Sequence, residues 1–352
     1  MVRGAPGTQE VLETETMLAP TTAGEFLRKV AIGDVCDLQR VQLRLQPRVR
    51  PHQRATTCTL DLDSSLYEQV SRQQAGATKA YNGELAYHPL LAFWAEAGEL
   101  LFSQLRQGSA HTGRNGRGFL RETLKRVPGG VDKTLRADRG FYRKPGVEWW
   151  QAHGFPFPIT VDQTDPLLEA MVVLPEQNWR PLPESELAEV AALRSQPTGW
   201  THPSRSVVTR ELAETKTGEL DWKYPAPVTN EAVPSAREVV VWHLQHAAVE
   251  TAIKEHKRGF GLEKLPTQKC QANWAYCLIG QLAVNLLAWF KRLVLPPQYQ
   301  RTTIKTIRHQ LLNLAGKIVH TARRCFLMRS DRYRSQAVWS FAIRQLAHLQ
   351  FG

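Results

Sequence analysis

The chain has 352 residues but is short of cysteine, and none of its cysteines forms a C-x-x-C pair. The five are Cys36, Cys58, Cys270, Cys277 and Cys325. A scattered, odd set of this kind excludes a disulfide framework and a zinc ribbon. The N-terminus also lacks a basic region followed by an apolar run, so it shows no secretory leader. These absences are typical of a protein that works in a reducing, intracellular setting.

Acidic residues are scarce in the last third of the chain. From residue 251 onward there are 17 Lys and Arg but only three Asp and Glu, a net charge of +14 against +12 for the whole chain. The first 250 residues therefore carry −2. Positive charge concentrated in one region is typical of a surface that contacts a polyanion, usually nucleic acid. The alternative is a solvated surface without a partner.

Long apolar runs are absent except at residues 274–290. Gln281 and Asn285 lie one helical turn apart inside this run, and Lys291 and Arg292 follow it. Two amides in the middle of the run favour a core helix over a membrane span. We therefore expect no membrane partner.

The clearest local pattern is a strict alternation over residues 57–63. It places Leu60 and Leu62 on one side of a predicted strand and Asp61 and Asp63 on the other. Two carboxylates therefore share one face near the end of the strand. We expect Asp61 to pair with a Lys or Arg and leave it outside the candidate site.

Further strand patterns follow in a characteristic order. Residues 90–96 and 99–105 flank Ala97 and Gly98 and predict a hairpin. An amphipathic helix is predicted over 119–127, and a second alternating run ends in Asp138. The predicted order is three strands, a helix and a fourth strand, and an acid ends both the first and the fourth strand. This is the order of the ribonuclease H-like fold. Since the first and fourth strands are neighbours in that fold, Asp63 and Asp138 should meet.

These patterns predict an α/β protein with a ribonuclease H-like (retroviral-integrase-like) mixed sheet, a β-rich insertion and C-terminal helices. Helical periodicity predicts helices over 237–256, 303–324 and 335–349. The expected parts are an N-terminal appendage or remnant (1–55), the first part of the catalytic core (56–142), the Pro- and Trp-containing insertion (143–237), the second part of the core (238–300) and a basic helical region (301–352).

The acids suggest a chemistry. Cleavage or transfer of phosphodiesters uses two divalent cations, which closely spaced carboxylates can hold. Asp63, Asp138 and Glu250, on the first strand, the fourth strand and a following helix, are the candidates. The alternatives are that Asp63 and Asp138 are ordinary strand-end or turn carboxylates, and that Glu250 is an i,i+4 partner of Lys254.

A family resemblance rests on five segments in order. They are T-L-D-L-D-S-S (59–65), Y-H-P-L-L-A-F (87–93), L-R-A-D-R-G-F-Y (135–142), P-V-T-N (227–230) and E-T-A-I-K-E-H-K-R-G-F-G-L-E-K-L-P (250–266). Together they resemble bacterial insertion-sequence transposases with a DDE catalytic domain of group 1, related to the cut-and-paste transposases with a YREK signature. The resemblance implies that Asp63, Asp138 and Glu250 are catalytic and bind two Mg²⁺ ions, with Mn²⁺ able to substitute.

The family also carries a Tyr seven and an Arg four residues before the Glu, and a Lys seven residues after it. Lys257 matches the Lys, whereas His243 and His246 stand at the other two positions. On one continuous helix, positions 243, 246, 250, 254 and 257 share a face, so each histidine could reach a phosphate if protonated.

The resemblance implies a DNA transposase that cleaves strands at the ends of an insertion sequence and transfers them. Its expected partner is double-stranded DNA, both transposon ends and target, bound by a homodimer in the bacterial cytoplasm at the nucleoid. The alternatives are an inactive, truncated relic that only binds DNA and a ribonuclease H-like nuclease without strand transfer. The expected DNA contacts are Lys257, Lys254, His246, His243, Arg258, Arg301, Lys305 and Arg308.

Overall fold

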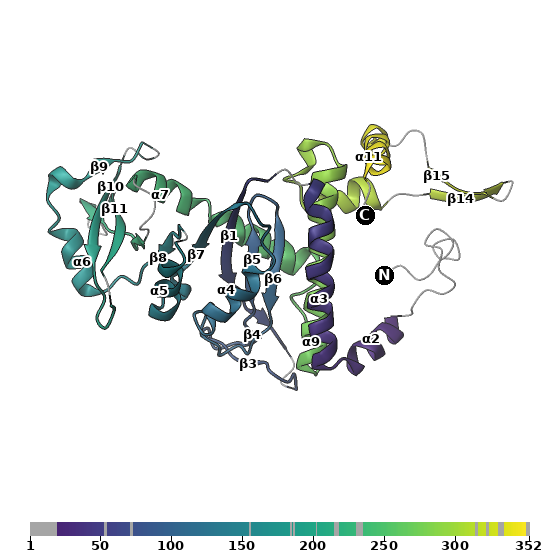
Figure 1. Cartoon of the computed structure of the whole chain (residues 1–352), viewed down its shortest axis with the longest axis horizontal. Coiled ribbons are helices and arrows are strands. Elements are labelled where there is room, and N and C mark those ends of the chain that lie inside the picture. The colour runs from purple at the N-terminus through teal and green to yellow at the C-terminus, as the bar shows by residue number, and fades with distance from the viewer. Residues whose placement is uncertain are drawn as a thin grey trace.

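The computed structural model describes residues 20–349 except 53–54, 71–72, 155, 184, 186, 202, 215–217, 230–234, 314–315, 322–323 and 330–333. Along its longest axis, the strands of residues 180–214 lie at one end and the sheet around residues 57–64 lies in the centre (Figure 1). Helices from the two ends of the chain and the long helix of residues 270–289 lie on the far side of that sheet (Figure 1). The chain is thus an elongated α/β molecule.

The central sheet has the strand order β6-β5-β1-β7-β8. Its strands are β1 (Thr57–Ser64), β5 (Leu90–Trp94), β6 (Glu99–Gln104), β7 (Asp132–Ala137) and β8 (Ile159–Thr160). Strand β1 pairs antiparallel with β5 and parallel with β7, and β7 continues parallel to β8. The predicted hairpin and the predicted neighbourhood of the two acid-bearing strands are both confirmed.

The same hydrogen-bonded sheet continues into the segment expected as a β-rich insertion. Beyond β8 the order is β13-β11-β10-β9, with β12 paired to β11. The elements are β9 (Arg180–Pro181), β10 (Ala188–Ser195), β11 (Ser204–Glu214), β12 (Leu220–Lys223), β13 (Val228–Thr229), α5 (Lys144–Ala152) and α6 (Asp165–Val172). Two helices therefore accompany the expected strands. Because β8 extends the sheet directly from β7, no break in hydrogen bonding marks residue 143, and the domain limits stay predictions.

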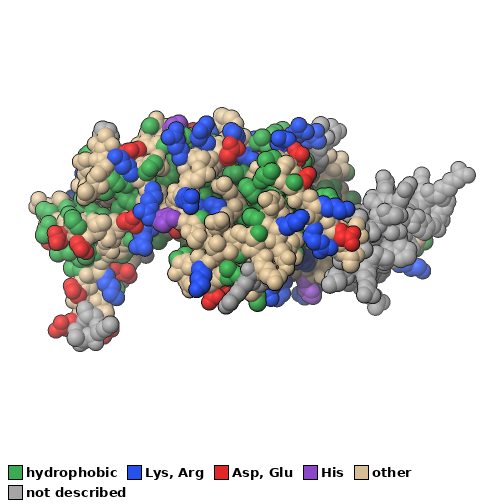
Figure 2. All heavy atoms as spheres, turned by 90° about the horizontal axis from the view of Figure 1, so that it is seen from below, with side chains coloured by type: hydrophobic (Ala, Val, Ile, Leu, Met, Phe, Trp, Pro, Cys, Tyr) green, Lys and Arg blue, Asp and Glu red, His purple; other side chains and the backbone are tan. Residues whose placement is uncertain are grey.

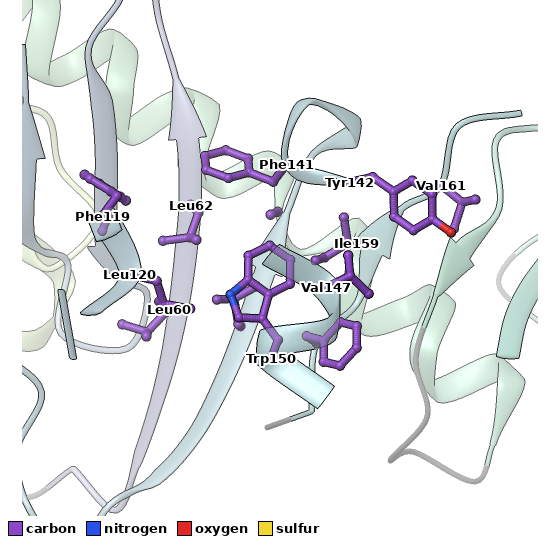
Figure 3. Packing of buried hydrophobic residues seen from close by; sticks show 14 of the residues in the cluster. Leu60, Leu62, Phe119, Leu120, Phe141, Tyr142, Val147, Trp150, Ile159 and Val161 are labelled. Carbon is purple, nitrogen blue, oxygen red and sulfur yellow. The ribbon is translucent and has the colours of Figure 1, made fainter. Parts of the chain in front are cut away.

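One face of the central sheet is covered by α5 and α4 (Gly116–Leu124). Leu60 and Leu62 of β1 belong to a buried cluster with Phe119, Leu120 and Trp150 of these helices (Figure 3). Helix α4 begins three residues before the predicted position and ends at Leu124. Since side chains alternate along β1, burying the leucines here leaves Asp61 and Asp63 on the opposite face.

The opposite face is covered by α8 (Ala247–Lys254) and α9 (Cys270–Trp289). Val249 and Ile253 of α8 pack on Leu91, Phe93 and Leu100. The helix predicted over 237–256 is divided into α7 (Ala236–Leu244), α8 and a π-helical turn (Glu255–Gly259). The reason is packing: Val239 of α7 lies in the core of the insertion, whereas α8 lies on the central sheet.

Helix α9 contains the apolar run. Residues Cys270–Val294 are long and apolar enough to cross a membrane by composition, but half of the apolar window is buried. Helix α3 (Ile32–Val49) lies along it, and the side chains of Asn285 and Gln281 donate to the carbonyl of Leu100 at 3.0 and 2.8 Å. The two amides thus join α9 to β6, and the predicted core helix is confirmed.

The C-terminal region departs from the prediction. Helix α10 (Ile304–Ile307) and a π-helical turn end at Leu312, and β14 (Gly316–Thr321) then pairs antiparallel with β15 (Arg324–Arg329) as a hairpin. The helix predicted to continue to 324 is therefore wrong. Ile318, Val319 and Thr321 are β-branched and favour a strand. The hairpin extends away from the body, and the last predicted helix is confirmed as α11 (Gln336–His348) (Figure 1).

One helix and three short strands lie outside the parts described so far. They are α2 (Pro20–Lys29), β2 (Tyr67–Glu68), β3 (Thr78–Lys79) and β4 (Leu85–Tyr87), of which the strands form a small sheet in the order β2-β4-β3.

Candidate active site

The structure brings two of the predicted acids to neighbouring strand ends. Asp63 lies near the end of β1, and Asp138 follows β7 directly. Burial raises the pKa of Asp63 to about 7, with the negative charge of Asp138 as the next cause. Burial also raises the pKa of Asp138. The two half-buried carboxylates repel each other, as expected where two anions share a poorly solvated site.

The third predicted acid comes from α8. Glu250 is exposed and borders a hollow of about 290 Å³ together with Asp63. Its charge is a further, smaller cause of the raised pKa of Asp63. Three of the predicted DNA contacts border the same hollow: Lys254, Lys257 and Arg258. Acidic and basic side chains therefore border one hollow between the end of β1 and α8.

Asp61 has a different environment although it shares a strand face with Asp63. Arg136 donates to both its oxygens, from Nε to Oδ1 at 2.6 Å and from Nη2 to Oδ2 at 2.8 Å. Only 3% of each side chain is exposed. His246 Nδ1 lies 3.1 Å from Asp61 Oδ1. The expected pairing of Asp61 with a Lys or Arg is confirmed, and its oxygens are already engaged.

The two histidines that replace the family Tyr and Arg make contacts within the protein. His243 Nε2 lies 3.0 Å from Thr160 Oγ1, and burial lowers the pKa of His243 to about 4, so it is neutral at pH 7. His246 contacts Asp61 instead. The helix expected over positions 243–257 is interrupted between Leu244 and Ala247, but the rings of His243 and His246 stack with their centroids 6.2 Å apart, so these two positions do share a side. The charge of His246 also lowers the pKa of Asp63 and Asp138, against the effect of burial.

The predicted DNA contacts beyond α8 lie on two adjoining segments. Lys257 Nζ donates to the carbonyl of Leu66 at 2.7 Å and lies 5.7 Å from the centre of the Tyr67 ring. This anchors the π-helical turn to the chain that leaves β1.

The other predicted cations are exposed. Arg258 pairs with Glu263 at 3.1 Å, and the guanidinium of Arg308 lies 5.8 Å from the centre of the Phe260 ring. Arg301 and Lys305 are exposed shortly before Arg308 in the sequence. Figure 2 shows Lys and Arg side chains distributed over the face it presents, with acidic side chains among them.

A second hollow, of about 330 Å³, borders Asp138 and contains polar residues to which the sequence analysis assigned no role. Ser64 Oγ lies 2.9 Å from His88 Nε2 and 3.1 Å from Thr112 Oγ1. Ser64 borders both hollows. The only signal in the sequence was the presence of Ser64 and His88 in two of the segments that carry the family resemblance.

The carboxylates have the right chemistry for a hard divalent cation, since Mg²⁺ prefers oxygen ligands. The repulsion that raises the pKa of Asp63 is also what a bound cation would relieve. Among the residues that the structure describes, however, no three His, Cys, Asp or Glu side chains are already arranged to hold a metal ion. The acids therefore fit a metal site in type and place but do not form a closed ligand set.

The comparisons with known proteins agree with the class of protein that this sheet and its acids suggest, a transposase. The family described as transposase DDE domain group 1 matches residues 4–351, and the chain belongs to this family. None of the curated proteins matches it.

Seven chains of solved structures match. One is a piggyBac transposase in a synaptic complex with hairpin DNA, determined by cryo-EM, with 11% identity and a TM-score of 0.45. The match covers 72% of this chain and 52% of that one, so this chain spans about half the length of that transposase.

Proposed function

We propose that the protein is a metal-dependent DNA transposase that cleaves DNA strands at the ends of an insertion sequence and joins them to a target. Asp63, Asp138 and Glu250 would hold two Mg²⁺ ions, which Mn²⁺ can replace. Bound cations would supply an activated oxygen nucleophile and balance charge on the phosphate and the leaving oxygen. The chain's own part is to place the three carboxylates and to bind the DNA backbone beside them.

One observation carries this proposal: three acids from distant parts of the chain influence one another at the end of β1. Asp138 and Glu250 both raise the pKa of Asp63, after burial. Ordinary strand-end carboxylates are exposed and have no reason to gather in this way. Perturbed carboxylates beside a hollow with cationic neighbours are typical of sites that handle phosphate.

The strand order supports a ribonuclease H-like core as part of the proposal. The order is β6-β5-β1-β7-β8, with β5 antiparallel to β1 and with β1, β7 and β8 parallel; it contains the hairpin and the pairing of the first and fourth strands that the sequence predicted. In this arrangement the C-terminal ends of β1 and β7 lie side by side. Helix α8 then brings Glu250 to the same end from the face that carries Asp63.

Double-stranded DNA is the proposed substrate. Lys254, Lys257 and Arg258 border the hollow of Asp63, and Arg301, Lys305 and Arg308 continue the basic surface along the chain. A homodimer that acts on paired transposon ends is the proposed assembly, as the family resemblance implies.

The test is cleavage of a labelled end fragment and strand transfer of a pre-cleaved end, in Mg²⁺ and in Mn²⁺. Asp63→Ala, Asp138→Ala and Glu250→Ala should each lose both reactions by at least about 10³-fold, because the cations would lack a ligand, while DNA binding stays within about threefold. Asp132→Ala is the matched control, since this exposed acid lies at the opposite end of β7 from Asp138. Normal cleavage by any of the three variants would refute the assignment.

One observation favours the alternative of an inactive, DNA-binding relic. His243 is neutral and bound to Thr160, and His246 is bound to Asp61, so both positions where the family has Tyr and Arg are engaged inside the protein. End-specific DNA binding without cleavage in either metal would favour the relic. Cleavage without strand transfer would favour a nuclease.

A further inference from the structure

Beside the acids, a buried histidine fixes the hydroxyl of Ser64. His88 is 5% exposed, and its Nδ1 lies 2.8 Å from the carbonyl oxygen of Ala110. A carbonyl only accepts hydrogen bonds, so Nδ1 carries the proton. Burial lowers the pKa of His88, which keeps the ring neutral at pH 7. In a neutral ring with the proton on Nδ1, Nε2 is an acceptor.

The tautomer determines what Ser64 can do. Because Nε2 of His88 accepts at 2.9 Å, the single hydroxyl proton of Ser64 is donated to it. Thr112 Oγ1, at 3.1 Å, must then be the donor to Ser64 Oγ. One lone pair of Ser64 Oγ is left, so this hydroxyl presents an acceptor and no donor.

The loop that carries Thr112 is held in place on both sides. Arg106 donates from Nε to the carbonyl of His88 at 3.0 Å and from Nη1 to the carbonyls of His111 and Thr112 at 3.1 and 3.3 Å. On the other side, a Cβ at Gly140 would lie only 2.8 Å from Cβ of Thr112. The three side chains are therefore fixed against the turn that follows Asp138.

Ser64 lies where the free lone pair of its hydroxyl oxygen could accept a hydrogen bond from a reactant beside the acids. Its backbone N–H donates to Asp63 Oδ1 at 2.6 Å, and the residue borders both the hollow of Asp63 and Glu250 and the hollow of Asp138. A water that attacks phosphorus must turn a lone pair toward it, which requires acceptors for its hydrogens. A 3′-hydroxyl is instead held by the DNA strand to which it belongs.

We propose that Ser64 accepts a hydrogen bond from the attacking water and so orients it for hydrolysis, with His88 and Thr112 as positioning residues that hold the Ser64 hydroxyl in its acceptor state. This role rests on the proposed function of the three acids. It assigns Ser64 to the hydrolytic nick in particular, because strand transfer uses a nucleophile that is already tethered.

The test compares the rate of hydrolytic nicking with the rate of strand transfer of a pre-cleaved end. Ser64→Ala should lower kcat for nicking about 10²-fold and strand transfer less than about fivefold, with KM for the DNA unchanged. Thr112→Val should lower nicking about tenfold, and Thr112→Ser, which keeps the hydroxyl, should restore it. Thr201→Val is the matched control, because the exposed Thr201 hydroxyl donates to Glu148 of α5 at 2.8 Å, outside the loop of Thr112.

Two substitutions at His88 separate positioning from folding. The longer side chain of His88→Gln can place an acceptor oxygen near the position of Nε2, within reach of Ser64. The shorter side chain of His88→Asn can bond the carbonyl of Ala110 but does not reach Ser64. We expect His88→Gln to nick at least about fivefold faster than His88→Asn, with equal melting temperatures for the two.

Equal losses of nicking and strand transfer in Ser64→Ala, or no loss of nicking, would overturn the role of Ser64. Asp63→Ala distinguishes the two proposals. If it cleaves normally, the proposed function fails; if it is inactive while Ser64→Ala nicks normally, only the role of Ser64 fails.

Discussion

At the scale of single residues, Asp61 and Asp63 show how one strand face can hold two carboxylates with opposite surroundings. Asp61 is enclosed by Arg136 and His246, whereas Asp63 faces the charges of Asp138 and Glu250. The alternation of the sequence predicted the shared face. The alternation could not show which of the two acids belongs to the site. Their surroundings differ because of residues that are 75 or more positions away in the sequence.

The raised pKa of Asp63 predicts a pH dependence of stability in the absence of divalent cations. Its folded pKa, about 7, is above the ordinary value of 3.8, so ionisation opposes folding. The stability contributed by this group is complete below pH 3.8 and is lost as the pH rises through about 7. Asp63→Asn should therefore stabilise the metal-free protein at pH 8 by on the order of 1 kcal/mol, measured by urea unfolding.

Asp132→Asn is the control for this prediction, since Asp132 is exposed at the other end of β7. At pH 4 the gain from Asp63→Asn should largely disappear, and at pH 8 Mg²⁺ should stabilise the unchanged protein more than the variant. An equal gain at both pH values would contradict the assigned cause.

At the scale of elements, the predictions that succeeded depended on local pattern. Strict alternation predicted β1 and β7, and the turn at Ala97 and Gly98 predicted the hairpin of β5 and β6. The break between α7 and α8 was not predictable, because it arises from packing on two different cores. Residues 316–321 and Arg324 were predicted as helix, but they lie in the paired strands β14 and β15.

Helix α9 is held to the sheet by polar contacts that can be tested. Asn285 accepts from the N–H of Leu100 at 2.8 Å and donates to its carbonyl at 3.0 Å, and its side chain is buried. Asn285→Ala should lower the free energy of unfolding by about 1–3 kcal/mol, because the N–H of Leu100 loses its partner while the carbonyl of Leu100 keeps only the bond from Gln281. The measurement is urea unfolding at constant pH.

The control for this prediction is Leu286, the next residue of α9, whose side chain is exposed. Leu286→Ala should change the free energy of unfolding by less than about 0.5 kcal/mol, because an exposed side chain loses few contacts. A similar effect of both substitutions would show that the amide contacts contribute little.

At the scale of the whole molecule, the charge asymmetry of the sequence indicated a nucleic-acid surface, and the order of its motifs indicated the family. The order of the predicted strands was enough to predict that Asp63 and Asp138 lie at neighbouring strand ends. The contacts of His243, His246, Ser64 and His88 could not be predicted in this way, since each depends on which elements the sheet brings together.

The basic surface predicts the salt dependence of DNA binding. Replacing both Lys305 and Arg308 by Gln should weaken binding to any DNA sequence and reduce the slope of log K against log salt concentration by about 1–2, since each phosphate contact releases about 0.9 counterion. The measurement is fluorescence anisotropy at several salt concentrations. Lys125→Gln is the control, because Lys125 is an exposed residue paired with Glu122 on α4; an equal change in its slope would contradict a localised contact.

The strand pairing that joins the central sheet to the insertion is short. Strand β7 meets β8 through the pair Ala137 and Ile159, and Asp138 is the very next residue. A mechanical load on strands β8 to β13 would therefore reach a proposed metal-binding carboxylate through a single peptide bond. Tension applied to the insertion, far from the acids, would in this way shift the position of Asp138.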